Sequence, residues 1–152
     1  MSEAEERHSG DCHSGGCHCG GIRYEVEGDL RPALICHCGM CQTIHSGPAY
    51  YSAAENERLK LTKSQTLSWY RASPSAARGF CTGCGASLFW RPEDGGYTAI
   101  SCGSLDRPSG VEAAAHVFLV DKGDYYQVTD GLPRFERGSG GKLPGVTTVL
   151  PE

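Results

Sequence analysis

The sequence lacks any long hydrophobic run and any concentration of basic residues. No apolar stretch approaches the roughly 20 residues that cross a bilayer, and the chain opens with acidic residues where a signal peptide would be basic and then apolar. Its 14 Lys and Arg residues are scattered, and the formal net charge is −4. Nucleic-acid-binding proteins need a basic patch that displaces counterions from phosphates. The sequence therefore predicts a soluble, cytoplasmic protein that binds neither membranes nor nucleic acid.

Helical periodicity is also scarce, and this indicates a mainly β domain. Apolar residues alternate with polar ones or form short runs that end at turn residues. The predicted strands cover Ile22–Glu27, Leu59–Leu61, Thr66–Tyr70, Leu88–Trp90, Tyr97–Ile100 and Ala115–Val120. Helical turns are expected only at Ala53–Leu59 and at Cys38–Ile44.

A length of 152 residues fits one folded domain. Residues 1–14 contain few apolar side chains that could anchor them, and we expect a mobile N-terminal tail there. Residues 138–152 are rich in Gly and Pro and predict a C-terminal extension. The folded domain itself is expected to span residues 15–137.

Cysteine, in contrast, is abundant. The chain has nine cysteines, and an odd number cannot close into intramolecular disulfides alone. In a reducing compartment, clustered cysteines are more often metal ligands or catalytic thiols than bridges. Seven of the nine fall into three closely spaced groups: Cys17-x-Cys19, Cys36-x-Cys38-x-x-Cys41 and Cys81-x-x-Cys84. Such spacings let two thiolates share one tetrahedral Zn²⁺ at Zn–S distances of about 2.3 Å.

The three groups can combine in more than one way. Cys17 and Cys19 with Cys81 and Cys84 make a closed four-thiolate site, which leaves the central triplet with three ligands. A zinc with three protein ligands keeps a fourth position for water or substrate, as catalytic zinc sites do. Alternatively, His37, His45 or Cys102 closes the triplet as a second structural site. A redox-active or empty triplet is a third reading.

Five motifs in order carry a resemblance to a known family. They are GGCHCGG at 15–21, CHCGMCQ at 36–42, FCTGCGASL at 80–88, GSLD at 103–106, and HVF at 116–118 leading to LPRFE at 132–136. Together they resemble the glutathione-dependent formaldehyde-activating enzyme (GFA) family, whose domain is shared with centromere protein V. The resemblance implies a β-tent (Mss-like) fold of coiled antiparallel sheets. It also implies two zinc ions, one structural at Cys17, Cys19, Cys81 and Cys84 and one catalytic at Cys36, Cys38 and Cys41.

The resemblance further implies a carbon–sulfur lyase. Such an enzyme joins glutathione to formaldehyde as S-(hydroxymethyl)glutathione, or cleaves that adduct, and another thiol or small aldehyde could take either place. The alternative is a noncatalytic zinc scaffold that binds protein. An oxidoreductase would instead need a reactive cysteine outside the clusters, for which only Cys12 and Cys102 remain. The oligomeric state stays open.

Several other side chains have candidate roles. His37 and His45 could carry protons beside the triplet, whereas His116 is interpreted as a core histidine and Asp106 as a turn cap. Glutathione carboxylates would need a cation, and the sequence does not rank the candidates Arg23, Arg71, Arg78 and Arg91. The aromatic residues Trp69, Tyr70, Phe89 and Trp90 are expected in the core and on strand faces, where one of them could border a ligand cleft.

Overall fold

The computed structural model describes residues 12–140. Residues 1–11 of the predicted tail and 141–152 of the predicted extension lie outside the described residues. Within the described range there are ten β-strands and one α-helix, which confirms the mainly β fold class. None of the helices in this range is long and apolar enough to cross a membrane.

A three-stranded antiparallel sheet joins the start of the described chain to a later strand. Its order is β1-β2-β5, with bounds His13–Gly16 (β1), Ile22–Val26 (β2) and Leu59–Ser64 (β5). Strand β2 alternates as its sequence predicts, because Ile22, Tyr24 and Val26 are fully buried and Glu25 is exposed. Strand pairing begins at His13, slightly ahead of the predicted domain start.

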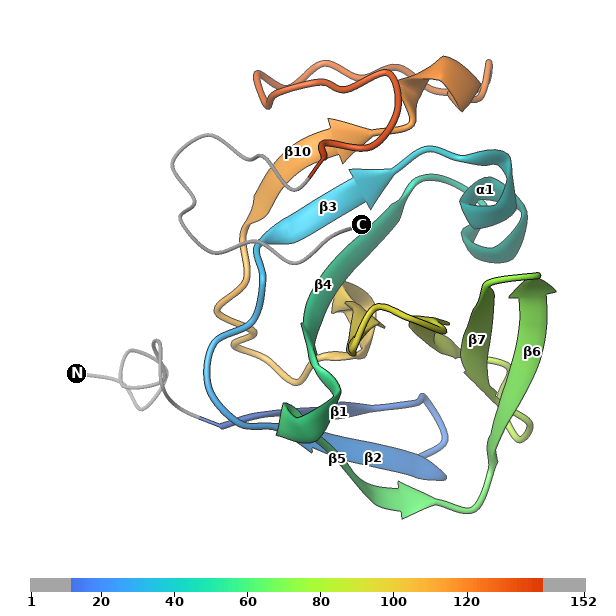
Figure 1. Ribbon diagram of the computed structural model, residues 1–152, viewed down its shortest axis with the longest axis vertical. Helices are drawn as coiled ribbons and strands as arrows, with labels where there is room; N and C mark the ends of the chain where they lie inside the picture. The colour runs from blue at the N-terminus through green and yellow to red at the C-terminus, as the bar shows by residue number, and fades with distance from the viewer. Residues whose placement is uncertain (1–11, 141–152) are drawn as a thin grey trace.

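A seven-stranded sheet forms the rest of the domain, in the order β10-β3-β4-β9-β8-β7-β6. The bounds are Ala33–Cys36 (β3), Ala49–Glu55 (β4), Leu67–Ser73 (β6), Ala76–Cys81 (β7), Ser87–Pro92 (β8), Tyr97–Ser101 (β9) and Ala113–Val117 (β10). All neighbours pair antiparallel except β10 and β3, which are parallel. Figure 1 shows β10, β3 and β4 at the top and β6 and β7 at the right.

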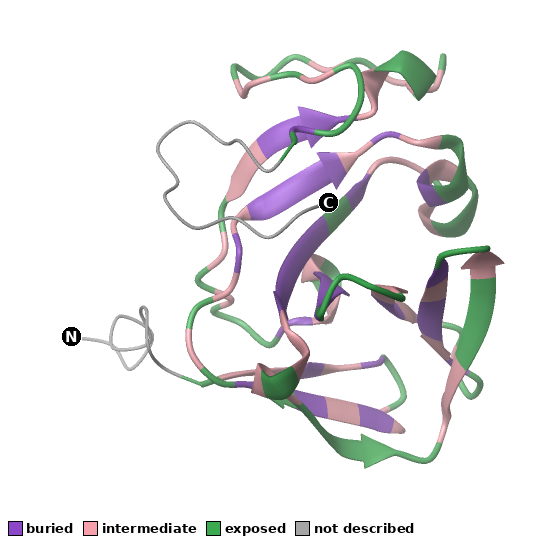
Figure 2. Cartoon of the chain, in the orientation of Figure 1, coloured by how far each residue is buried: buried purple, intermediate pink, exposed green. Residues whose placement is uncertain are grey.

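The main core contains residues of both sheets. Tyr24 of β2 and Phe89 of β8 meet edge to face, with ring centroids 5.4 Å apart, and both are fully buried. Cys17 and Cys81 belong to the same buried cluster. Figure 2 shows mostly buried residues along β3 and β4, whereas β5 and the edge strand β6 are largely exposed. The interior of the domain thus reaches the cysteine-bearing turns.

The segment between β3 and β4 folds as the sequence predicts. Helix α1 (Gly39–His45) begins after Cys38, whose sulfur accepts a hydrogen bond from the backbone N–H of Cys41 at 3.4 Å. The helix ends at Ser46, which has a left-handed φ of 64° and donates its N–H to the Gln42 carbonyl. The helical turn expected at Cys38–Ile44 is therefore confirmed.

The helical turn predicted at Ala53–Leu59 is confirmed only for its second half. Strand β4 continues to Glu55, and only a short 3₁₀ turn, η2 (Asn56–Arg58), precedes β5. Ala53 and Ala54 are fully buried and pair with Ala99 and Thr98 of β9. Packing in the sheet interior overrides the helix propensity of alanine there.

Two further expectations need correction. Trp69 and Tyr70 lie on the edge strand β6, as expected of strand-face residues, but they are 38% and 58% exposed and do not belong to the core. The strand predicted at Ala115–Val120 ends at Val117, because Phe118 takes a left-handed φ of 57°. The 3₁₀ turns after β9 and β10 are η3 (Cys102–Ser104) and η4 (Leu119–Asp121).

Gly15 tests how β1 is held against the core. A Cβ at this position would overlap the Ser104 carbonyl oxygen and the ring of Tyr24. We expect Gly15→Ala to lower the free energy of unfolding by about 1–3 kcal/mol, measured as a fall in Tm. Gly103→Ala is the control, because no neighbouring atom lies within 4 Å of its Cβ. Equal Tm values for the two variants would contradict this account of β1.

Candidate metal centres and the adjoining cavity

Four cysteines from two distant turns come together in the structure. Cys17 and Cys19 lie in the turn between β1 and β2, and Cys81 and Cys84 lie at the end of β7 and in the turn that follows. The four sulfur atoms, which we call the four-cysteine cluster, all lie within 4.8 Å of one another. Two Sγ–Sγ distances are 3.7 Å (Cys17–Cys19) and 3.6 Å (Cys19–Cys81). A tetrahedral ion with bonds of about 2.3 Å requires an edge of about 3.8 Å, so the geometry fits a bound metal.

Donors around Cys81 favour thiolate over thiol, whereas at Cys19 the backbone N–H of Gly21 is outweighed by the neighbouring sulfur atoms, which raise the pKa to about 11. The backbone N–H groups of Gly83 and Cys84 point at Cys81 Sγ at 3.3 and 3.4 Å, and the N–H of Ile22 points at Cys17 Sγ at 3.2 Å. The Thr66 hydroxyl, 3.2 Å from Cys81 Sγ, and these backbone donors lower the pKa of the Cys81 thiol to about 6. Because metal ligands must be deprotonated, these contacts prepare the cluster for a cation.

Three cysteines form a second cluster between the end of β3 and the first turn of α1, which we call the three-cysteine cluster. Cys36 ends β3, Cys38 precedes α1 and Cys41 lies in its first turn, and their sulfur atoms also lie within 4.8 Å of one another. Cys41 is buried and the other two are half-buried. Both groupings predicted from the spacing are therefore present, and each of these two clusters could hold a metal ion.

The three-cysteine cluster has a buried cation as its neighbour. Arg78 of β7 donates from one terminal nitrogen to Cys41 Sγ at 3.5 Å. Burial opposes the charge of Arg78, but the neighbouring Tyr51, Cys41 and Cys38 raise its pKa. Hydrogen bonds from Cys36 and Cys41 hold the pKa of Cys38 far below its usual value. The site thus combines a stabilised thiolate with a permanent positive charge.

The residues considered as a fourth ligand point elsewhere. The His37 ring nitrogens contact Tyr126 and His116, neither of them a sulfur atom, and His45 Nε2 contacts the Tyr51 hydroxyl at 2.8 Å. Cys102 is not part of the cluster. Within residues 12–140 the second cluster therefore contains three cysteine ligands and no histidine.

His37 belongs to a chain of hydrogen bonds that runs from the half-buried Tyr126 through two buried histidines to the exposed Asp130. Its Nδ1 lies 2.7 Å from the Tyr126 hydroxyl, its Nε2 lies 2.8 Å from His116 Nδ1, and His116 Nε2 lies 2.9 Å from Asp130 Oδ1. The bond from His116 lowers the pKa of Asp130, and burial lowers the pKa of His37 to about 4. The ionised carboxylate of Asp130 can only accept a hydrogen bond, and this fixes the direction of donation along the chain. Tyr126 donates to His37, His37 donates to His116, and His116 donates to Asp130. The chain ties the cysteine loop to β10 and to the segment that follows it.

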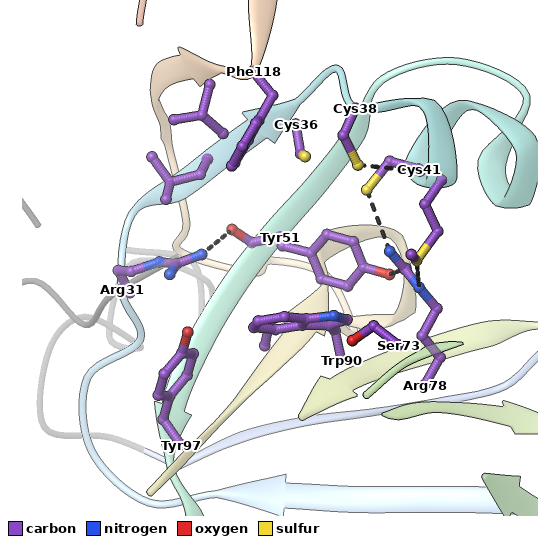
Figure 3. Close-up of a pocket in the computed structure, with 14 residues that line it drawn as sticks. Arg31, Cys36, Cys38, Cys41, Tyr51, Ser73, Arg78, Trp90, Tyr97 and Phe118 are labelled. Atoms are coloured by element: carbon purple, nitrogen blue, oxygen red, sulfur yellow. Dashed lines mark hydrogen bonds between the residues drawn. The ribbon is translucent and has the colours of Figure 1, made fainter. Parts of the chain in front are cut away.

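A cavity of about 260 Å³ adjoins the three-cysteine cluster. Figure 3 shows the sulfur atoms at one side of it and the rings of Tyr51 and Trp90 across its middle. Phe118 and Tyr97 also line the wall. Burial raises the pKa of Tyr51 to about 12, so its hydroxyl stays protonated and donates to His45. Aromatic carbon thus forms much of the wall.

The position of the cavity distinguishes among the four arginines that the sequence offered as partners for the glutathione carboxylates. Only Arg78 of the four candidates lines it, together with Arg31, which sequence analysis missed. Arg23 is paired with Asp106, whose side chain also accepts from Ser14, so Asp106 anchors β1 and β2. The remaining candidates contact Glu93 (Arg71) and the Trp69 ring (Arg91).

Other residues of the site had no sequence signal. Tyr51 lay between the two predicted helical turns, where no element was predicted, and Tyr126 and Asp130 lay in a stretch without regular structure. His116 is 4% exposed, as expected of a core histidine, yet it also links His37 to Asp130. Only the fold brings these residues to one place.

The hydrogen-bond chain can be tested with two adjacent tyrosines. Tyr126→Phe leaves the buried acceptor Nδ1 of His37 without its donor, which costs about 1–2 kcal/mol and should lower the Tm by several degrees. Tyr125→Phe is the control, because Tyr125 is 59% exposed. Thermal unfolding of both variants at equal metal content is the measurement, and equal Tm values would refute the role assigned to Tyr126.

Comparisons with known proteins agree with the cysteine arrangement. A family model described as glutathione-dependent formaldehyde-activating enzyme matches residues 12–121. Among solved structures, the crystal structure of a Rhodobacter sphaeroides protein shares the fold, with a TM-score of 0.55 and 20% identity over 80% of this chain and 98% of that chain. No curated protein matched the sequence. Because the family model covers more than half of its residues, this chain belongs to the glutathione-dependent formaldehyde-activating enzyme family.

Proposed function

We propose that this chain is a zinc-dependent carbon–sulfur lyase that forms or cleaves a thiol–aldehyde adduct, such as S-(hydroxymethyl)glutathione. The observation that carries the proposal is the difference between the two clusters. One offers four sulfur ligands at tetrahedral spacing, whereas the other offers three and adjoins a cavity. A closed site suits a structural metal, and a three-ligand site leaves one position for substrate.

Zinc is the metal that we assign to both clusters, because soft thiolate ligands in tetrahedral geometry select it. Cys17, Cys19, Cys81 and Cys84 hold the structural ion, and Cys36, Cys38 and Cys41 hold the catalytic one. When bound there, zinc would supply the positive charge that deprotonates an incoming thiol at the open position, and it would polarise a carbonyl less well because three thiolates already donate to it. Thiolate ligands need a reducing environment, so we place the protein in the cytoplasm.

The chain's own side chains then have separate tasks. Three thiolates carry more negative charge than a divalent cation cancels, and the guanidinium of Arg78 offsets the excess at Cys41. Arg78 also donates to the Tyr51 hydroxyl at 3.1 Å, which orients that hydroxyl in the cavity wall. His45, which accepts from Tyr51, lines a second and more polar hollow. Tyr51 and His45 thereby form a route for a proton between the cavity and that hollow.

The reaction balances as an addition. The thiol sulfur forms a bond to the carbonyl carbon, the C=O π pair moves to oxygen, and the proton lost by the thiol ends on that oxygen. Tyr51 and His45 supply the proton relay at the oxygen, and the reverse steps release the aldehyde. No oxidant or reductant takes part.

Two alternatives have less support. A noncatalytic scaffold with two closed metal sites would need a fourth ligand at the triplet, but the ring nitrogens of His37 and His45 contact other groups. A thiol oxidoreductase would need a reactive cysteine outside the clusters. Burial raises the pKa of Cys102 to about 11, which makes it a poor nucleophile at neutral pH.

Serine substitutions should separate the two metal sites. We expect the wild-type chain to hold two zinc ions and Cys36→Ser to lose one while it stays folded. Cys81→Ser should lose soluble folded protein, because a structural zinc contributes on the order of 10 kcal/mol of apparent binding energy to folding. Elemental analysis and circular dichroism are the measurements, with Cys102→Ser as the control. Equal zinc content and equal folded fractions in Cys36→Ser and Cys81→Ser would contradict the division into structural and catalytic sites.

Exchange spectroscopy tests the activity directly. ¹³C-formaldehyde and glutathione equilibrate with their adduct without an enzyme, so the uncatalysed exchange rate is the baseline. Zinc-loaded protein should accelerate the exchange, and the triple variant with serine at Cys36, Cys38 and Cys41 should return it to the baseline. Cys102→Ser should retain the acceleration. Acceleration that persists in the triple variant would place the chemistry elsewhere.

A further inference from the structure

The cavity beside the three-cysteine cluster is larger and less polar than formaldehyde requires. Its volume is about 260 Å³, and rings and aliphatic side chains make up most of its wall, among them Leu34, Trp90, Val117 and Phe118. Formaldehyde has no carbon substituent that could occupy this space. Apolar walls stabilise a ligand in proportion to the apolar area that it removes from water.

The cations in the wall are directed at protein atoms. The guanidinium of Arg78 donates to Tyr51 Oη, Cys41 Sγ and Met40 Sδ, the last at 3.3 Å. Arg31 is 5% exposed and donates to the Tyr51 carbonyl at 2.9 Å. The charged groups of a peptide thiol would lose hydration beside the aromatic carbon that makes up much of the wall, which is unfavourable. The cavity is therefore better suited to an uncharged group than to the two carboxylates of glutathione.

Phe118 adds an independent observation. It takes a left-handed φ of 57°, which is an outlier for a bulky residue, and Figure 3 shows its ring directed into the cavity. Its backbone N–H donates to the Arg137 carbonyl at 3.0 Å, so the conformation is held from the C-terminal side. Such strain persists where the surrounding structure enforces it, and it clusters at ligand sites. The strained backbone keeps an aromatic ring in the wall.

From these observations we propose that the cavity binds the apolar substituent of a larger aldehyde, of aromatic or branched aliphatic class. This inference rests on the proposed lyase function. The thiol adds to the carbonyl carbon of R–CHO, a C–S bond replaces the C=O π bond, and the thiol proton moves to oxygen. The substituent R lies against Phe118 and Trp90 while the carbonyl carbon faces the three sulfur atoms. The charged part of the thiol stays outside the cavity.

The first experiment compares aldehydes with one thiol. Exchange spectroscopy with glutathione should give at least a tenfold larger acceleration for phenylacetaldehyde and 3-methylbutanal than for formaldehyde, each relative to its uncatalysed rate. Phe118→Gly removes the ring and relieves the positive φ, and it should reduce this preference about tenfold or more. Phe118→Asn, which also tolerates the left-handed region, should act in the same way and serves if the glycine variant is unstable.

Ser46→Gly is the matched control. Ser46 has a similar φ of 64°, is exposed, and does not line the cavity. The substitution relieves the same backbone strain without removing a ring from the wall, so the aldehyde preference should remain. A preference that falls equally in Ser46→Gly would attribute the effect to backbone relaxation and overturn the role of Phe118.

A binding measurement that does not depend on turnover separates the two proposals. The unreactive alcohol 2-phenylethanol should shift the methyl resonances of Leu34 and Val117 in wild-type protein and not in Phe118→Gly, and ethylene glycol should shift neither. Equal acceleration for formaldehyde and phenylacetaldehyde, with no 2-phenylethanol shifts, would overturn the aldehyde class and leave the lyase function. Binding of 2-phenylethanol without acceleration for any aldehyde would overturn the lyase function instead.

Discussion

Sulfur atoms that carry negative charge repel one another, and this domain holds seven of them in two clusters whose members lie within 4.8 Å. A cation, hydrogen-bond donors or both must offset the electrostatic repulsion between sulfur atoms that lie this close together. At the four-cysteine cluster, backbone N–H groups of Ile22, Gly83 and Cys84 point at sulfur. The four cysteines come from the turn between β1 and β2 and from the end of β7 with the turn that follows it. The cluster therefore joins the two sheets. The main core then packs directly against this junction.

At the three-cysteine cluster, a side chain offsets the repulsion between the sulfur atoms. Arg78 reaches Cys41 from β7, which is distant in sequence, and its remaining donors orient Tyr51 and contact Met40. The loop that carries these cysteines is fixed from its other side by the chain through His37, His116 and Asp130. One side of the cluster is therefore rigid and polar, and the other opens on aromatic carbon. This asymmetry is what gives the site the character of a binding pocket.

Phe118 shows how the end of β10 serves that pocket. Strand β10 ends at Val117, and η4 begins at Leu119. Between them, Phe118 has a left-handed φ, and its ring is directed into the cavity. A strand that continued to Val120, as the sequence pattern predicts, would lack this turn into the cavity. The parallel pairing of β10 with β3 brings this end beside Cys36. Strand direction and a strained residue together set the shape of the wall.

The sequence by itself determined the local chemistry of this protein. The cysteine spacings predicted three local groups of metal ligands, the alternation in Ile22–Glu27 predicted β2, and the residues around Cys41 predicted α1, because these features depend on neighbours in the chain. The spacings left open how the three groups combine, and the fold joins the first group to the third. Only the tertiary structure decided which distant groups meet. Arg78, Tyr51 and Phe118 reach one cavity from three separate strands or strand ends, and Ala53 is a strand residue because it pairs with Ala99 in the buried part of the sheet. Long-range packing, burial and strand direction set those contacts, and none of them leaves a periodic signal in the sequence.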